Sequence, residues 1–568
     1  MPLDRGRHAP PALEQGIAFC HGDSDMLTDN LSSSARAWSL WLTRQPSVTG
    51  STGEQALPGL LREKMTASKA LREATCWLIE ADGDPLKRTC LAVLVRGSGR
   101  ETVLLTGHFD TVSVADYGDL AALATEPEAL KTALLARLAD PVTPAEHRAR
   151  ADLESGDFLP GRGLLDMKSG LAAGLAALEA FAAIPERAGN LLFVAVPDEE
   201  VNSVGARALA DALPQLQRDH DITLVAAINL DAIADDGDGS HGRAIALGSV
   251  GKLLLTAFVV GQPSHACYPF SGVNAGALGA ALAQELEWNP ALADTAQAQT
   301  GMPPTLLSIR DGKAGYDVTT PETAFLIWNA LSLGRGAEET FASFRTLVDT
   351  AAERFAEKLT ERQRTVTGDA AIPALQKAMV IEAATLLGLA KSDPANRAAL
   401  ATLAGRLASE GHSLPEQCRQ LTEAAWRCSG LRGPAVVVGL GSLPYPPVAL
   451  GDDPQGARLR EALEAARNRA VLRTGQPIRI EPFFQGISDM SFLGQAQVAD
   501  VPFIAANTPA WTSGVRWSGQ VCHLPTINIG PWGRDYHTPL ERLYTPYAFD
   551  VLPRLVLETA VGVLEQRR

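Results

Sequence analysis

The chain has 568 residues, with 65 acidic and 50 basic side chains and a formal net charge of −15. This charge repels phosphate backbones and anionic membrane surfaces, so neither nucleic acid nor a membrane is an expected partner. Hydrophobic residues make up 46% of the chain, as in ordinary globular proteins. The apolar runs are far shorter than the roughly 18 residues that a membrane-spanning helix needs. At roughly 100 to 200 residues per domain, the length allows several domains.

The cysteines and the N-terminus indicate the compartment. The seven cysteines are an odd number without a C-x-x-C pair, which favours a reducing environment over a disulfide or zinc-ribbon framework. The first residues contain no apolar segment of the kind found in secretion signals. We therefore expect a cytoplasmic protein with a flexible leader over residues 1–30.

The first half of the chain alternates between apolar strands and helices. Expected helices cover 32–42, 169–183 and 203–213. Expected strands cover 76–79, 91–95, 103–106, 191–196 and 222–228. Continuous apolar strands that alternate with helices predict an α/β fold with a mostly parallel sheet covered on both faces. The stretch 118–155, rich in Ala, Leu and Glu, is interpreted as an insertion.

From Lys252 the pattern changes to strand, helix, strand, strand and helix, which predicts a separate α+β domain over 249–364. Residues 365–431 are expected to form a mainly helical insertion. The strand rhythm then resumes, and the expected elements are strands at 436–440, 478–484, 503–507 and 526–529 and a helix at 546–566. The first domain is therefore expected to be discontinuous, built from 31–248 and 432–568.

Three predicted strands end in histidine or carboxylate residues. His108 and Asp110 follow the strand at 103–106, Glu199 and Glu200 follow the next, and Asp231 follows the third. Ligands bind at the carboxyl ends of parallel strands, and these ends meet at one edge of the sheet. We therefore expect these side chains to lie close together.

Two further segments carry the same residue types. Asp166 lies in G-R-G-L-L-D-M-K-S-G and His537 in Y-H-T-P-L-E. Two imidazoles with three carboxylates suit zinc, cobalt or manganese and are too rich in nitrogen for a calcium cage. A single H-x-D pair is more often a surface turn, and an isolated pair of glutamates is usually solvated. Five such segments together predict a metal site.

These motifs resemble the M-20 family of di-zinc peptidases and amidohydrolases, which includes aminoacylases, dipeptidases, glutamate carboxypeptidase and succinyl-diaminopimelate desuccinylase. The segments G-H-F-D-T-V, G-R-G-x-x-D-M-K-S-G, P-D-E-E, N-L-D and Y-H-T-P occur in family order, and G-Q-P-S-H-A around His265 resembles a motif of the family's lid domain. The resemblance covers about 35–568. The long chain, H-F-D-T-V and S-V-G-K at 249–252 most resemble an arginine-utilisation branch of the family.

The resemblance implies a zinc-peptidase-like catalytic domain, a lid domain at 249–364 and two bound divalent metal ions, zinc before cobalt or manganese. The ligands it implies are His108 and Asp231 for one metal, Glu200 and His537 for the other, and Asp166 as the bridge. Asp110 would accept a hydrogen bond from the imidazole of His108. Glu199 is left as the general base, which takes a proton from the attacking water and passes it to the leaving amine.

The expected function is metal-dependent hydrolysis of an amide bond in a small peptide or N-acyl amino acid. The resemblance implies that His265 donates a hydrogen bond to the developing oxyanion. In dimeric members of the family, this oxyanion lies in the active site of the partner chain. A homodimer through the lid domain is therefore one alternative for this chain. The family's lid motif Asp-x-Arg is replaced by Asn329-Ala-Leu331, so no residue is assigned to a substrate carboxylate.

The sequence is also compatible with two alternative functions. A non-catalytic relative that binds an amino-acid derivative would be favoured by a missing ligand or base, and the motifs lack neither. A metal-dependent phosphoesterase would need cationic side chains for the phosphoryl charge, and Arg162 and Lys168 could supply them.

Overall fold

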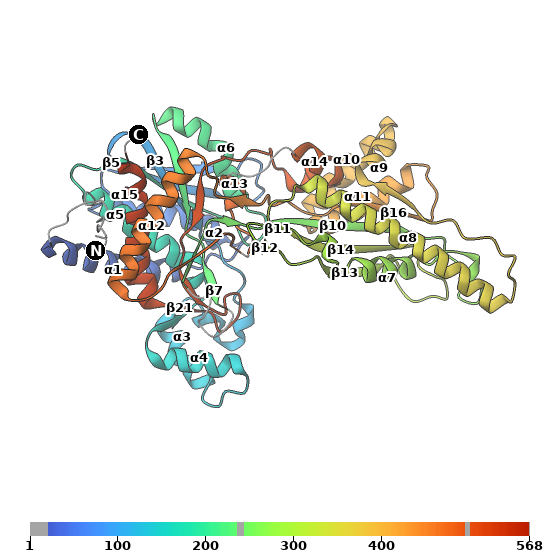
Figure 1. Ribbon diagram of the computed structural model, residues 1–568, viewed down its shortest axis with the longest axis horizontal. Coiled ribbons are helices and arrows are strands. Elements are labelled where there is room, and N and C mark those ends of the chain that lie inside the picture. Colours follow the sequence, from blue (N-terminus) through green and yellow to red (C-terminus); the bar gives the residue numbers. More distant parts are fainter. Residues whose placement is uncertain (1–20, 236–242, 485, 495–499, 567–568) are drawn as a thin grey trace, which may run out of the picture.

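The computed structural model describes residues 21–235, 243–484, 486–494 and 500–566. An eight-stranded sheet organises the main domain, and a five-stranded sheet organises the lid domain. The lid domain extends away from the main domain, so the molecule is elongated (Figure 1).

The main sheet has the strand order β1-β2-β5-β3-β6-β19-β8-β18. Its strands are β1 (Thr75–Glu80), β2 (Thr89–Arg96), β3 (Ser98–His108), β5 (Ala188–Val196), β6 (Thr223–Asn229), β8 (Ala244–Ala246), β18 (Arg479–Glu481) and β19 (Thr526–Asn528). The neighbours β5, β3, β6 and β19 run parallel, whereas β1 and β2 form an antiparallel edge. The predicted α/β fold with a mostly parallel sheet is confirmed.

Helices cover both faces of this sheet, because its strands carry apolar side chains on both sides. In β3, Val103 and Leu105 enter one core while Leu104 enters the other. The first core is covered by α1 (His21–Thr43), α2 (Thr52–Ala67), α5 (Ser169–Ala183), α12 (Pro454–Thr474) and α15 (Leu552–Glu565), and the second by α6 (Val204–Asp219).

A small sheet joins segments that are far apart in the sequence. Its order is β4-β21-β20-β7. The strands are β4 (Phe158–Pro160), β21 (Arg542–Tyr544), β20 (Trp532–Arg534) and β7 (Ile233–Asp235). These strands flank three candidate ligands, since β4 precedes Asp166, β7 follows Asp231, and His537 lies between β20 and β21. The small sheet therefore fixes the loops of the predicted site relative to one another.

The insertion near residue 118 forms a helical unit beside this small sheet (Figure 1). It consists of η1 (Ala115–Leu123), α3 (Pro127–Arg137) and α4 (Pro144–Ser155). Leu130, Leu134 and Leu153 belong to its own apolar core. At the start of α4, Thr143 and Glu146 form a capping box, which satisfies backbone N–H groups of the first turn.

The lid sheet has the order β13-β14-β10-β16-β15. Its strands are β10 (Gly251–Val260), β13 (Thr305–Asp311), β14 (Thr323–Ser332), β15 (Met379–Glu382) and β16 (Ala435–Leu440). One face packs on α7 (Ala275–Leu286) and α8 (Ala337–Thr367), and the other on α9 (Ala383–Lys391) and α11 (Leu414–Cys428), with α10 (Pro394–Ser409) beside them. The insertion at 365–431 thus adds an edge strand and three helices to the lid.

Three elements differ from the sequence-based expectations. The strand β16, expected to open the second catalytic segment at 432, pairs with β10 in the lid sheet. The segment 503–507, expected as a strand, lies in the helix α14 (Val501–Asn507). The helix α1 begins at His21, inside the expected leader, and residues 1–20 lie outside the described residues. Short apolar runs do not reveal which sheet they join, or whether they form strands.

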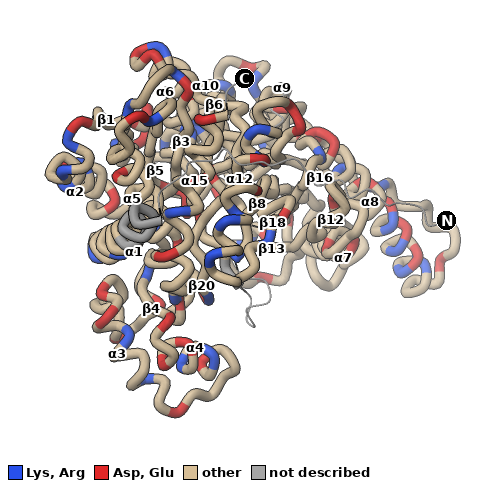
Figure 2. The backbone as a smooth tube through the Cα atoms, turned by 60° about the vertical axis from the view of Figure 1, so that its left-hand side comes forward, with Lys and Arg blue, Asp and Glu red and all other residues tan. Residues whose placement is uncertain are grey.

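Charged residues of both signs are interspersed along the surface helices, as α8 illustrates in Figure 2. Among the described residues, no helix combines the length and the apolar character needed to cross a membrane.

Candidate metal centre

Candidate ligands converge at the carboxyl edge of the main sheet. His108 is the last residue of β3, while Glu199 and Glu200 follow β5 and Asp231 follows β6. Since β5, β3 and β6 are parallel neighbours, their loops emerge at the same edge. Asp166 reaches this edge from the short segment η2 (Leu164–Lys168), just before α5.

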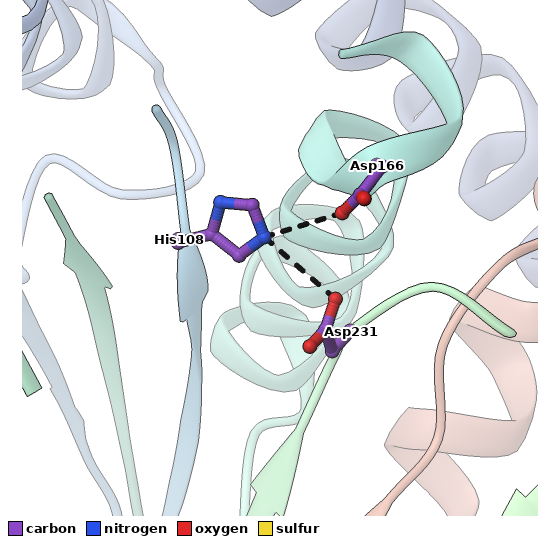
Figure 3. A group of neighbouring side chains, drawn as sticks. All are labelled: His108, Asp166 and Asp231. Atoms are coloured by element: carbon purple, nitrogen blue, oxygen red, sulfur yellow. Dashed lines mark ion pairs between the residues drawn. The ribbon is translucent and has the colours of Figure 1, made fainter. Parts of the chain in front are cut away.

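The first group of potential ligands consists of His108, Asp166 and Asp231. The imidazole of His108 points between the two carboxylates (Figure 3). Its Nε2 atom lies 3.2 Å from Oδ1 of Asp166 and 3.7 Å from Oδ1 of Asp231. All three side chains are buried.

The second group consists of Asp166, Glu200 and His537. The Nε2 atom of His537 lies 3.0 Å from Oδ2 of Asp166 and 3.2 Å from Oε2 of Glu200. Asp166 therefore presents one oxygen to each group. The side chain of His108 is 2% exposed and that of His537 is 42% exposed, so the site opens on the side of His537.

The spacing of these atoms fits a pair of metal ions. Two ligand atoms that lie about 2.0 to 2.2 Å from one tetrahedral ion are separated by about 3.3 to 3.6 Å. The nitrogen–oxygen distances in the two groups, 3.0 to 3.7 Å, lie close to this separation. Nitrogen and carboxylate oxygen donors suit zinc, cobalt and manganese. The residues present can hold two divalent ions with Asp166 between them.

The electrostatics of the site agree with this fit. Burial raises the pKa of Glu200 and of Asp231 above their usual values. Burial also acts on Asp166, but hydrogen bonds from His108 and His537 hold the pKa of that carboxyl below its usual range. The site thus concentrates more carboxylate charge than its two imidazoles neutralise. Bound divalent cations would compensate this charge.

Asp110 contacts residues of both ligand groups without belonging to either group. Its Oδ1 and Oδ2 atoms accept hydrogen bonds from the backbone N–H groups of Glu199 (3.1 Å) and Glu200 (3.3 Å), and Thr49 Oγ1 donates to Oδ2 at 2.8 Å. Oδ1 of Asp110 also lies 3.6 Å from Nδ1 of His108. Nδ1 of His108 instead donates a hydrogen bond to the backbone oxygen of Asp110 at 3.1 Å. Asp110 therefore orients the loop of the two glutamates with its carboxylate and the imidazole with its backbone oxygen, which corrects the expected hydrogen bond from the imidazole to the carboxylate.

Glu199 lies at the centre without belonging to either ligand group. Its Oε2 atom is 4.0 Å from Nε2 of His108, and its side chain is 12% exposed. Burial raises the pKa of Glu199 well above its usual value, while the nearby His108 lowers it and the carboxylates of Asp231 and Asp489 raise it. Because Glu199 lies beside both ligand groups and belongs to neither, its carboxyl group is available to exchange a proton.

A buried ion pair supports the bridging residue. Arg162 pairs with Glu541 (Nη1 to Oε2, 2.6 Å) and with Asp116 (Nη2 to Oδ2, 2.6 Å). Oε1 of Glu541 accepts hydrogen bonds from the backbone of Gly163 (2.9 Å) and Asp166 (3.5 Å). The pair thus joins the loops of Asp166 and His537 to the inserted helical unit.

We expect Arg162→Met to destabilise the fold by about 3 to 5 kcal/mol, because it leaves the carboxylate of Glu541 buried without its cation. Chemical denaturation followed by circular dichroism measures this loss. The control is Arg406→Met, which removes an exposed pair between Arg406 on α10 and Glu410 and is expected to change the stability little. Equal effects of the two substitutions would contradict the supporting role of Arg162.

Asp489 also lies near the site, although no sequence motif indicates it. This residue is buried, and neither oxygen of its carboxyl group has a hydrogen-bond partner in the described part of the chain. Burial raises its pKa to about 7. A lone acidic residue in the segment Gly486-Ile-Ser-Asp489 carries no periodicity or spacing that could have indicated its position.

The structure does not bring His265 into the metal centre of its own chain. Lys252, at the start of β10, lies near Glu199, and His265 follows the far end of the same strand. Ten strand residues span about 33 Å at about 3.3 Å per residue, so the two ends of β10 are far apart. His265 is exposed, and its Nδ1 accepts a hydrogen bond from the backbone of Cys267 at 3.1 Å.

Comparisons with known proteins agree with this architecture. The chain is 32% identical over 542 residues to the uncharacterized protein YqjN of Bacillus subtilis (strain 168), covering 92% of this chain and 95% of that protein. It is 28% identical over 541 residues to protein RocB of the same organism, covering 92% and 93% of the two chains. A solved tripeptidase from Staphylococcus aureus shares the fold, with a TM-score of 0.52 at 16% identity over 94% of this chain and 99% of that one.

The sequence profile of peptidase family M20/M25/M40 matches residues 104–510. This match contains both lid and main-domain elements, from β3 through α14, and all the candidate ligands except His537. Together with the relative that is 32% identical over nearly the whole chain, it shows that the chain belongs to peptidase family M20/M25/M40.

Proposed function

We propose that the protein hydrolyses an amide bond in a small peptide or N-acyl amino acid. The observation that carries the proposal is the pair of three-residue ligand groups that share Asp166, with the carboxyl group of Glu199 beside them. When bound there, two divalent ions, with zinc as the first candidate, would acidify a water molecule and polarise the substrate carbonyl. The sequence resemblance to an arginine-utilisation branch makes an arginine-related amide one candidate within this class.

The residues of the chain divide the remaining work. Glu199 accepts a proton from the attacking water and donates it to the leaving nitrogen, so that the products are a carboxylate and an amine. The carboxylate of Asp110 positions Glu199 by accepting a hydrogen bond from its backbone N–H, and the backbone oxygen of Asp110 positions His108 by accepting one from the imidazole. His265 of a second chain would donate to the developing oxyanion, which requires a homodimer through the lid.

The two alternatives have less support. The cationic residues that would favour a phosphoesterase are engaged elsewhere: Arg162 pairs with Glu541 and Asp116, and the buried Lys168 donates to the backbone oxygen of Gln45 at 2.7 Å. A non-catalytic binding protein would not need Glu199 outside both ligand groups. Amide hydrolysis uses both ligand groups and Glu199.

Substrate profiling of the metal-loaded protein tests this proposal. The panel contains N-acyl amino acids, dipeptides and p-nitrophenyl phosphate, assayed with zinc, cobalt and manganese in turn. Metal-dependent turnover of an amide, absent after chelation, is the expected result. Turnover of the phosphate ester alone would favour the phosphoesterase, and binding of the amino-acid derivatives without turnover would favour the non-catalytic relative.

We expect Asp166→Ala to weaken the binding of both metals, because each ligand group loses one of its three members. Elemental analysis after dialysis against a series of metal-buffered solutions measures the occupancy. Asp140→Ala, at an exposed position between α3 and α4, is the control. A variant without Asp166 that retained two tightly bound metals would refute the bridging assignment.

A further inference from the structure

The side chain of Lys252 projects from the base of the lid toward the main domain. It lies on β10, whose next residues Leu253 and Leu255 belong to the lid core. Successive side chains of a strand alternate between its two faces, so Lys252 points away from that core. The residue is half-buried, and the carboxyl group of Glu199 contributes to its electrostatic surroundings.

Tyr445 fixes the position of this lysine. The two residues are paired across antiparallel backbone segments, with hydrogen bonds of 2.7 Å from Lys252 N to Tyr445 O and 3.0 Å from Tyr445 N to Lys252 O. The ammonium nitrogen of Lys252 lies 5.1 Å from the centre of the Tyr445 ring. The hydroxyl of Tyr445 is 3.1 Å from Oγ of Ser203, in the loop that carries Glu199. The lysine is therefore held beside the metal centre.

The ammonium group of Lys252 makes neither a hydrogen bond nor an ion pair within the described part of the chain, apart from its contact with the tyrosine ring. A half-buried charge without a partner is costly. The groups that surround the centre are mainly carboxyls, namely Asp166, Glu199, Glu200, Asp231 and Asp489. Lys252 is a cation beside this centre that belongs to neither ligand group, so its charge remains available to a substrate carboxylate.

We propose that Lys252 binds a carboxylate group of the substrate, next to the amide that is cleaved. The inference rests on the proposed amide hydrolysis and narrows its substrates to N-acyl amino acids or dipeptides with a free carboxylate. Lys252 acts as a specificity determinant: it selects among amides by charge. The mobile ammonium of a lysine suits a single carboxylate oxygen, while the aromatic ring of Tyr445 restricts its movement.

The test compares each substrate with its uncharged counterpart. The probes are the N-acetyl derivatives of leucine, arginine and glutamate and their α-carboxamides. In the zinc-loaded wild-type protein we expect the free acid to be preferred. Lys252→Met should lower kcat/KM for the acid by about 10- to 100-fold, mainly through KM, because a charge-assisted contact is lost, and should change the carboxamide little. Lys252→Arg should retain most of the preference.

Lys377→Met is the matched control, because Lys377 is an exposed lid lysine paired with Asp349. An equal loss for acid and carboxamide would overturn the inference and assign Lys252 to the support of Glu199 or of the oxyanion. A wild-type protein that cleaves acid and carboxamide equally well would also overturn it.

A binding measurement separates this inference from the proposed function. Isothermal titration of zinc-loaded Glu199→Gln, with and without Lys252→Met, measures the affinity for each N-acetyl amino acid in the absence of turnover. A 10- to 100-fold weaker affinity without Lys252 would support the carboxylate site even if the wild-type protein cleaved none of the probes, an outcome that would count against the proposed hydrolysis alone. Unchanged affinity, or no binding of any carboxylate, would overturn the inference.

Discussion

We expect Glu199→Gln to retain both metals and to lower kcat by about 10² to 10⁴, the usual effect of removing a general base. The amide of glutamine preserves the shape of the side chain but cannot accept the proton of the attacking water. Glu199 belongs to neither three-residue ligand group, so metal occupancy should not change. Steady-state kinetics and elemental analysis of the same preparation measure the two quantities together.

Glu200→Gln serves as the matched comparison, one residue away on the same loop. The Oε2 atom of Glu200 lies 3.2 Å from Nε2 of His537, so its loss should lower metal occupancy, and added metal should restore part of the activity. Added metal should not rescue Glu199→Gln. Equal metal loss in the two variants would refute the separate roles of the two glutamates.

The sequence predicted the main domain well because its strands are long and apolar. The strands at 103–106 and 191–196 stand at the centre of the observed sheet, and Asp231 follows the next strand, as expected. The predictions failed where the pattern was short or where pairing decided the outcome. The apolar pattern of 436–440 would suit a strand of either sheet. Only its pairing with β10 assigns it to the lid. The segment 503–507 is too short to distinguish a strand from the helix that it forms.

The candidate ligands could be predicted because each lies in a motif at a strand end or a loop of the sheet edge. Their mutual distances could not, since Asp166 and His537 are separated by about 370 residues and meet only through the small sheet. The same limit applies to Asp489 and Lys252. Each is a single charged residue in its segment. The position of Lys252 beside Glu199 depends on the packing of the lid against the main domain, and that of Asp489 on the contacts of the following helix, Met490–Leu493, with α6 and β19. Arg162 could be noticed in the sequence, but its pairing with Glu541 could not.

The position of His265 decides what kind of role it can have. The strand β10 separates it from the metal centre of its own chain, and its side chain is exposed at the far end of the lid. If His265 were buried, it would be expected to contribute to stability. Its side chain is exposed, which does not support such a structural role. A histidine that serves catalysis from this position must act on the metal centre of a second chain.

We therefore expect His265→Ala to lower kcat and kcat/KM together by about 10² to 10³, as removal of an oxyanion donor does, with little change in stability.

Mixing inactive His265→Ala chains with inactive Glu199→Gln chains should restore activity, because a hybrid dimer contains one site with an intact base and an intact donor. Random exchange in an equal mixture places one such site in about half of the dimers, which predicts recovery of about a quarter of the wild-type activity. Size-exclusion chromatography of each mixture establishes that dimers are present, and native mass spectrometry of the mixture establishes that the two variants have exchanged subunits. A monodisperse His265→Ala protein with wild-type kcat/KM would exclude His265 from the mechanism, and dimers that exchange subunits without recovering activity would exclude its action across the interface.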